Sequence, residues 1–258
     1  MILTLDVGNS NIHGVVFDGE EVRLEFRRTT TNITSDEVGL FLRGVLRENG
    51  FDWRDIAAIG FCTVVPDAVH ALRNACRKYF DTTPFVLAAG VKTGLKIRYR
   101  NPTEVGADRI ANAIGLADRH PSRNGIAVDF GTATTFEVVT SDREYLGGVI
   151  APGLRLSVDA LGRNTAKLSS VEIIAPDHVI GRSAVEGIQS GVWYGHVGMI
   201  REVVARVADE AFGGDPPVIV GSGGFASLFE DAGIFDEIVP DLVPRGVRVA
   251  MLLNGEAA

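Results

Sequence analysis

The sequence is poor in cysteine and in positive charge, and each shortage excludes a class of protein. Its 258 residues include two cysteines, Cys62 and Cys76, which cannot form a disulfide framework and show no zinc-site spacing with each other or with the five histidines. A reducing cytoplasm is the simplest setting for such a chain. The 25 lysines and arginines are outnumbered by 33 acidic residues, so the formal net charge is −8. Nucleic acid is therefore not an expected partner.

Long hydrophobic runs are also missing. No apolar stretch approaches the roughly 18 residues that a membrane-spanning helix needs. The first ten residues carry no basic segment, and they reach Asp6 too early for the apolar core of a signal peptide. The sequence therefore predicts neither a membrane protein nor a secreted one. Hydrophobic residues still make up 46% of the chain, which is enough for the core of one large domain or two smaller ones.

What the chain does contain is one pattern that occurs twice, at 2–17 and at 126–139. In each copy an apolar segment leads to an acid, a small-residue turn and a second apolar segment, which is typical of strand–turn–strand. The aligned pairs are Asp6 with Asp129, Gly8 with Gly131, Asn9 with Thr132 and Asn11 with Thr134. Backbone N–H groups and hydroxyls in such a turn can bind phosphate oxygens, and the acid can hold a metal ion on them.

Two interpretations of these aspartates are open. Either one alone is most simply a turn former that hydrogen-bonds its own backbone. The repetition in matched settings favours a duplicated fold whose two turns face one polyphosphate. In that interpretation Asp6 lies near Mg²⁺ and the nucleotide phosphates, Asp129 holds a second cation, and Thr132 donates to phosphate.

The surrounding segments predict an α/β protein with two similar halves, at 1–117 and 118–258. The first half follows the order βββαβαβ of a ribonuclease-H-like fold, and the second half repeats the plan. The expected strands are 2–7, 13–17, 22–29, 56–61, 85–87, 126–129, 134–140, 145–150 and one from 217 that enters a Gly-rich turn before a helix. The expected helices include 35–48, 67–80, 110–117, one after Leu154, 185–212 and 246–253. Glycines 191, 195 and 198 in the long helix indicate close helix packing, a break or a subunit contact.

A polar stretch at 92–109 separates the halves, and Pro102 and Gly106 keep it out of regular helix. Asp108 stands at the start of the next helix. It could be a helix N-cap, or a carboxylate held beside a site as a general base. Arg109 would then be an anion-binding partner. The run Gly221–Gly224 could likewise be a plain loop or a close approach for a nucleotide.

Together these residues resemble the type III pantothenate kinase family of the acetate-and-sugar-kinase/Hsc70/actin superfamily. The resemblance runs nearly end to end. Its most specific segments are 6–11, 101–110, 129–136 and 147–154. The Gly-Ala-Asp-Arg run at 106–109 distinguishes this family from other kinases of the fold.

The resemblance implies two ribonuclease-H-like, actin-like ATPase halves and a specific reaction. That reaction is the ATP-dependent phosphorylation of pantothenate to 4′-phosphopantothenate, the first step of coenzyme A synthesis, with Asp108 as the base. The implied pantothenate-binding residues are Tyr99, Gly106, Ala107, Asp108, Arg109 and Ala184. The implied ATP-binding residues are Asp6, Val7, Gly8, Asn9, Ser10, Asn11, Ile12, His13 and Thr132. Asp6 would hold Mg²⁺ with ATP, and Asp129 would hold potassium or ammonium. Similar enzymes are homodimers with a shared pantothenate site.

One position departs from the family pattern. The segment before the long helix usually carries a substrate-contacting threonine, but here it reads Gly181-Arg182-Ser183-Ala184. Ala184 cannot hydrogen-bond through its side chain, which would weaken pantothenate binding by ~0.5–1.5 kcal/mol. Two other functions stay open on this basis. One is a nucleotide-binding regulatory protein of the same fold with weak or no kinase activity. The other is a kinase of another hydroxy acid or sugar, against which Tyr99 and the 106–109 run argue.

Overall fold

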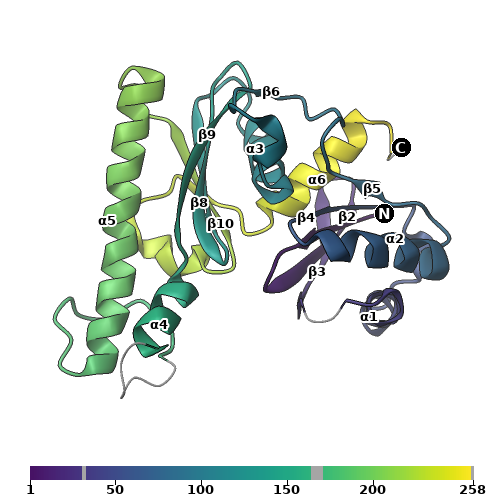
Figure 1. Cartoon of the computed structure of the whole chain (residues 1–258), viewed down its shortest axis with the longest axis horizontal. Helices are drawn as coiled ribbons and strands as arrows, with labels where there is room; N and C mark the ends of the chain where they lie inside the picture. The colour runs from purple at the N-terminus through teal and green to yellow at the C-terminus, as the bar shows by residue number, and fades with distance from the viewer. Residues whose placement is uncertain (31–32, 164–170, 257–258) are drawn as a thin grey trace. The chain divides into compact units, whose positions relative to one another are not determined.

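The computed structural model describes residues 1–30, 33–163 and 171–256. The chain forms two compact units (Figure 1). The first unit is Met1–Asp118 together with the segment from Asp241 onward, and the second is Arg119–Pro240. The division at 118 falls beside the predicted one. The final segment is grouped with the first unit, whereas the sequence interpretation placed it in the second half.

The first unit is built on a five-stranded mixed sheet in the order β3-β2-β1-β4-β5. Strands β1 to β3 form an antiparallel meander, while β4 and β5 continue the sheet in parallel with β1. The bounds are β1 (Ile2–Val7), β2 (Asn11–Asp18), β3 (Glu21–Thr29), β4 (Ala58–Thr63) and β5 (Phe85–Val86). The predicted meander and the two parallel strands are present. The tips of β1 and β4 lie side by side because parallel neighbours end at the same edge.

Two helices cover the face of this sheet that the odd-numbered residues of β1 occupy. They are α1 (Ser35–Glu48) and α2 (Pro66–Phe80), and they pack with Leu3, Leu5 and Val7 in one buried cluster. Helix α1 begins where Thr34 and Glu37 form a capping box, with each side chain bonded to the other's backbone N–H. Because strand side chains alternate between faces, the side chain of Asp6 points to the opposite face.

That opposite face is covered by the last helix, α6 (Leu242–Leu253), which contacts β1, β2 and β4. A Cβ on Gly60 in β4 would collide with the Met251 side chain, so strand and helix approach closely there. The helix starts four residues before the predicted Gly246. Its proline, Pro244, falls in the first turn, where a proline removes no intrahelical hydrogen bond.

Helix α3 (Ala107–Arg119) packs against α6 through reciprocal glycine contacts. A Cβ on Gly246 would overlap the carbonyl oxygen of Ala111, and one on Gly115 would lie 2.7 Å from the Leu242 carbonyl oxygen. Helix α3 is longer at both ends than the predicted 110–117, so Asp108 lies inside its first turn. The stretch at 92–106 before α3 is irregular as predicted, apart from β6 (Lys96–Ile97) and a short 3₁₀ turn at Pro102–Glu104. Another 3₁₀ turn, Trp53–Asp55, precedes β4.

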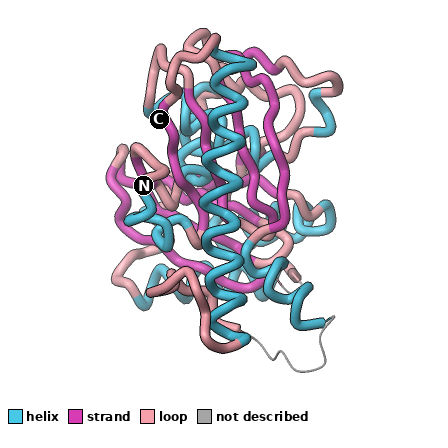
Figure 2. Tube along the Cα trace, turned by 90° about the vertical axis from the view of Figure 1, so that its left-hand side faces the viewer, coloured by secondary structure: helices cyan, strands magenta, loops and turns pink. Residues whose placement is uncertain are grey.

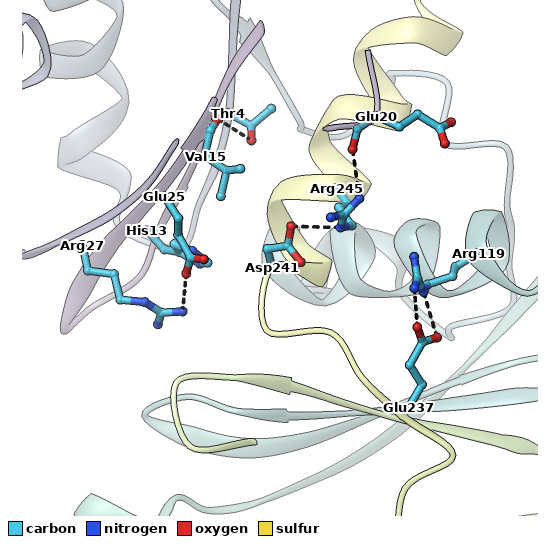
Figure 3. Close-up of polar contacts among 10 residues, drawn as sticks. All are labelled: Thr4, His13, Val15, Glu20, Glu25, Arg27, Arg119, Glu237, Asp241 and Arg245. Atoms are coloured by element: carbon cyan, nitrogen blue, oxygen red, sulfur yellow. Dashed lines mark hydrogen bonds and ion pairs between the residues drawn. The ribbon is translucent and has the colours of Figure 1, made fainter. Parts of the chain in front are cut away.

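The second unit repeats the strand plan of the first in the order β11-β10-β7-β8-β9. Strands β7 to β9 form the antiparallel meander, and β10 and β11 run parallel to β7. The bounds are β7 (Gly125–Phe130), β8 (Ala133–Val139), β9 (Glu144–Pro152), β10 (Val218–Gly223) and β11 (Glu237–Ile238). After β10 the predicted helix is a 3₁₀ helix, η3 (Ala226–Ala232). At the start of this unit Arg119 binds Glu237 of β11 (Figure 3). His120 binds the same carboxylate.

Helices α4 (Leu154–Arg163) and α5 (Ala184–Phe212) belong to the same unit, and α5 runs along its sheet (Figure 2). Beneath α5, Phe130 stacks on Phe229 at 4.7 Å between ring centroids, and Phe229 stacks on Trp193 at 5.8 Å. This aromatic column anchors the end of β7, directly after Asp129. Stacked pairs of this kind add ~0.5–1.5 kcal/mol beyond their burial.

The glycines of α5 do not break it, because the helix is continuous over 29 residues. They do not serve close packing among the described residues either, since a Cβ on Gly187, Gly191, Gly195 or Gly198 would meet nothing within 4 Å. Of the three interpretations, the subunit contact remains as a prediction. None of the described helices combines the length and apolarity that crossing a bilayer requires.

Candidate active site

The first predicted turn follows β1 as expected. Gly8 N–H donates to the Asn11 carbonyl oxygen at 3.0 Å and closes the turn, and Thr30 N–H donates to the Ser10 carbonyl at 2.8 Å. Asn9, Ser10 and Asn11 are exposed, so their side chains and backbone can meet a ligand. The carboxylate of Asp6 is partly exposed at the end of the strand.

Three of the predicted ATP-binding residues of this turn have buried side chains. Val7 and Ile12 belong to the apolar cluster under α1 and α2. The His13 imidazole is bound to Glu25 at 2.9 Å, and Arg27 binds the same carboxylate at 3.3 Å (Figure 3). Burial, together with the charge of Arg27, lowers the pKa of His13 against the opposing effect of Glu25. The side chains of Val7 and Ile12 are therefore part of the core, and the His13 imidazole is engaged by Glu25.

Asp108 is half-buried in the first turn of α3. Its Oδ1 accepts the N–H of Arg109 at 2.8 Å, and the Arg109 side chain itself is buried. Burial raises the pKa of Asp108, although the N–H and the guanidinium of Arg109 oppose the shift. Gly106 permits this arrangement, because a Cβ there would collide with Asp108 Oδ1. The carboxylate is thus a better proton acceptor than an exposed aspartate.

The loop that leads to Asp108 is held by its own polar side chains. Asn101 Oδ1 accepts the N–H of Thr103 at 3.3 Å and its hydroxyl at 2.7 Å, while Asn101 Nδ2 donates to Glu104 at 2.7 Å. These bonds fold Pro102–Glu104 into its 3₁₀ turn. The loop that leads to Gly106 is therefore held in shape by the side chains of Asn101, Thr103 and Glu104.

Cys62 contacts a predicted site residue, and the sequence analysis did not anticipate this contact. Strand β4 pairs in parallel with β1 so that Cys62 stands beside Asp6. The buried thiol donates to Asp6 Oδ1 at 3.5 Å. No linear spacing signals this contact, since the two residues are 56 positions apart and meet only through the strand register.

The second turn lies in the second unit and is one residue shorter than the first. The last pair before the turn is Val7 with Ile12 in the first unit, and Phe130 with Thr134 in the second. The alignment of Asn11 with Thr134 is therefore wrong, and Ile12 is the counterpart of Thr134. Gly131 N–H donates to the Ala133 carbonyl at 3.1 Å, and Thr132 is exposed at the tip.

Asp129 sits in a cradle of glycines at the end of β7. Gly223 has φ +85°, and a Cβ there would collide with Asp129 Oδ1. A Cβ on Gly153, just before α4, would collide with the Thr132 carbonyl oxygen and lie 2.7 Å from that of Gly131. The Asp129 carboxylate thus lies against the backbone at Gly223, and two carbonyl oxygens of the following turn lie close to the backbone at Gly153. Oxygen donors of this kind suit a hard cation.

The comparison with known sequences assigns the family. The sequence model of type III pantothenate kinase matches residues 2–206. Type III pantothenate kinase of Legionella pneumophila is 57% identical over 254 residues, covering 98% of this chain and 99% of that protein. The Elusimicrobium minutum enzyme of the same name is 45% identical, again over 98% of this chain and 99% of its own length. This chain belongs to the type III pantothenate kinase family. The prediction of an enzyme of the kinase class is confirmed.

Solved structures agree on the fold of this pantothenate kinase family member. A Campylobacter jejuni protein assigned to the Baf family of transcriptional activators aligns with TM-score 0.63 at 19% identity, over 99% of this chain and 100% of its own. The activator of 2-hydroxyisocaproyl-CoA dehydratase from Clostridium difficile, solved with bound ADPNP, gives TM-score 0.52 at 14% identity, over 100% and 98%. The predicted fold class, two ribonuclease-H-like halves as in actin-like kinases and ATPases, is confirmed.

The segment at 181–184, which departs from the family's sequence pattern, forms the N-terminal start of α5. Ser183 is the N-cap, and its Oγ accepts the N–H of Glu186 at 3.2 Å. Ala184 is the first helical residue, and its side chain is exposed. The Ser183 hydroxyl oxygen is thus already engaged in capping. Tyr99, the remaining predicted substrate residue, is half-buried in the stretch before α3.

The metal chemistry of the pantothenate kinase fold needs few protein ligands here. Among the described residues, no three His, Cys, Asp or Glu side chains form a group that could hold a metal ion. Mg²⁺ in phosphoryl-transfer sites keeps several waters and binds one or two carboxylates plus substrate phosphates, which suits the single carboxylate of Asp6.

Proposed function

We propose that this chain transfers the γ-phosphoryl group of ATP to the primary hydroxyl of pantothenate, giving 4′-phosphopantothenate. The observation that carries the proposal is the carboxylate of Asp108, whose pKa is raised by burial beside the buried Arg109. A base with a raised pKa accepts a hydroxyl proton more readily. Relatives at 57% and 45% identity that bear the name of this activity support the choice of substrate.

The roles proposed for the residues follow from the chemistry of phosphoryl transfer, which depends on positioning and charge neutralisation. Asp108 takes or orients the hydroxyl proton, and Arg109 holds the pantothenate carboxylate with Gly106, Ala107 and Tyr99 around it. Asp6, the exposed turn 9–11 and Thr132 bind ATP with Mg²⁺. Asp129 holds potassium or ammonium, which adds positive charge near the phosphates. The two free thiols fit a cytoplasmic enzyme.

An ADP-release assay tests the reaction directly. Purified protein is incubated with ATP, Mg²⁺ and pantothenate in potassium or in sodium buffer, and the product is identified by mass spectrometry. We expect ADP release that requires pantothenate and is faster in potassium, because Asp129 would bind the larger cation. ATP binding without pantothenate-dependent turnover in either salt would overturn the proposal and favour the regulatory protein.

A homodimer with a shared pantothenate site is part of the same proposal. Helix α5 buries few of its residues, and Gly187, Gly191 and Tyr194 are exposed along it. Beside this row lies an apolar groove of about 420 Å³ between α4 and α5, lined by Leu161, Ile188, Val192 and Met199 among others. Glycines let a partner backbone approach closely, so a second copy of this helix fits the surface.

Sedimentation of the wild type should give twice the 27.6 kDa chain mass. Gly191→Arg places a long charged side chain in the groove and should yield monomers with reduced pantothenate turnover. Glu48→Arg, at an exposed position at the end of α1, serves as the control for added positive charge. A monomeric wild type, or a monomeric Gly191→Arg with full activity, would contradict the shared site.

A further inference from the structure

Cys62 occupies an unusual place for a buried thiol, because its side chain bonds to a carboxylate of the proposed site. It is fully buried in β4, and Sγ lies 3.5 Å from Asp6 Oδ1. The next residue bonds elsewhere, since the Thr63 hydroxyl donates to the Val7 carbonyl at 2.9 Å. The thiol of Cys62 thus bonds to the Asp6 side chain, whereas the Thr63 hydroxyl bonds to the backbone of β1.

The two carboxylates of the proposed site in the first unit, Asp6 and Asp108, both affect the pKa of this thiol. Burial raises the pKa of Cys62 well above its usual value, and the negative charges of Asp6 and Asp108 raise it further. A cysteine thiol is largely uncharged at neutral pH, so Cys62 offers Asp6 a neutral S–H donor at 3.5 Å. A charged donor at this position would compete with Mg²⁺ for Asp6, whereas an apolar group would leave the orientation of Asp6 without this bond.

The second unit repeats the strand register of this pair. Strand β10 is the counterpart of β4, and its register sets Ser222 beside Asp129 as Cys62 is set beside Asp6. Ser222 is 1% exposed. In both halves a small buried side chain with one S–H or O–H donor stands at the strand position paired with the acid. Ser222 Oγ is buried without a hydrogen-bond partner among the described residues, so the second unit shares the register of this pair but not the bond.

We propose that Cys62 is a positioning residue of the kinase site, whose S–H holds the Asp6 carboxylate in the orientation that binds MgATP. The proposal rests on the proposed function for the role of Asp6. It concerns the nucleotide side of the site, so its effect should fall on MgATP and spare pantothenate.

The test compares four variants with the wild type. Cys62→Ala and Cys62→Val remove the donor, and Cys62→Ser keeps one. Cys76→Ala removes an equally buried thiol in α2, whose pKa is raised by burial alone. Isothermal titration with Mg²⁺ and a non-hydrolysable ATP analogue gives Kd without turnover. Steady-state kinetics give KM for ATP and for pantothenate, and thermal melting confirms that each variant is folded.

We expect the Kd and KM for MgATP to rise about fivefold to tenfold in Cys62→Ala and Cys62→Val, since a weak donor to a charged acceptor is lost. KM for pantothenate should stay near the wild-type value, and Cys62→Ser and Cys76→Ala should bind MgATP like the wild type. Unchanged MgATP binding in the donor-free variants would overturn the proposal, as would equal weakening by Cys62→Ser. A wild type that binds MgATP without phosphorylating pantothenate would instead refute the proposed function, and the titrations would still decide the role of Cys62.

Discussion

Replacing Asp108 by asparagine is expected to lower kcat by about 100-fold or more, because proton acceptance by the carboxylate is lost in the transition state. Binding of MgATP should be almost unchanged, since Asp6 and the two turns are intact. Asparagine retains an oxygen that can accept the Arg109 N–H, which Asp108 Oδ1 does at 2.8 Å. Steady-state kinetics and titration with an ATP analogue measure the two effects separately.

The chain offers a matched control in Asp67. It is the second residue of α2, as Asp108 is of α3, but its side chain is exposed. Asp67→Asn should leave kcat and KM unchanged. Near-normal turnover in Asp108→Asn would remove Asp108 from the role of base and leave it as a helix-start residue.

The raised pKa of Asp108 also predicts opposite pH effects on activity and stability. The base works only when deprotonated, so kcat/KM should fall as the pH drops through a value above that of an ordinary aspartate. A carboxyl group whose folded-state pKa is raised stabilises the fold at low pH and loses that contribution as the pH rises. Asp108→Asn should therefore melt slightly higher than the wild type at neutral pH, and the difference should vanish in acid. A variant that melts lower at neutral pH would contradict this sign.

Gly246→Ala is expected to lower the free energy of unfolding by about 1–3 kcal/mol, the range for an overpacked contact. The added methyl would overlap the carbonyl oxygen of Ala111, and backbone cannot rotate away as a side chain can. Helices α3 and α6 must then separate, which shifts Asp108. Because a displacement of ~1 Å can cost ~100-fold in rate, kcat should fall together with stability. Urea unfolding and steady-state kinetics measure both.

Gly44→Ala is the control for this substitution. Gly44 lies in α1 of the same unit, and a Cβ there would meet nothing within 4 Å. Alanine at that position should stabilise the protein by about 1 kcal/mol through helix propensity alone, with kcat unchanged. Wild-type stability and activity in Gly246→Ala would show that the α3–α6 contact is not critical for the site.

Local patterns carried much of the fold prediction. The two acid–glycine turns identified both hairpins, because strand alternation and turn residues are encoded over a dozen positions. The same reasoning misaligned Asn11 with Thr134, since a gapless comparison cannot detect that the second turn is one residue shorter. The ends of α3 were also missed, because Gly106 and Pro102 mask a helix start whose stability comes from packing against α6.

The parts of the site that escaped prediction depend on pairing between distant segments. Cys62 meets Asp6, and Ser222 stands beside Asp129, only through parallel strand register, which no short motif specifies. Gly223 looked like a loop residue, yet its positive φ and its closeness to Asp129 Oδ1 make it part of the cradle. In each case the residue type was visible in the sequence, but its neighbour was not.

The return of α6 to the first unit has a consequence for biosynthesis. The second unit is one continuous stretch, whereas the first is interrupted by it and finished by the last residues of the chain. During translation the strands of the first unit are synthesised before α6, so the face that receives α6 stays uncovered until that helix has emerged. The second unit can fold before the first unit is complete. Premature termination would therefore harm the half that was synthesised earliest.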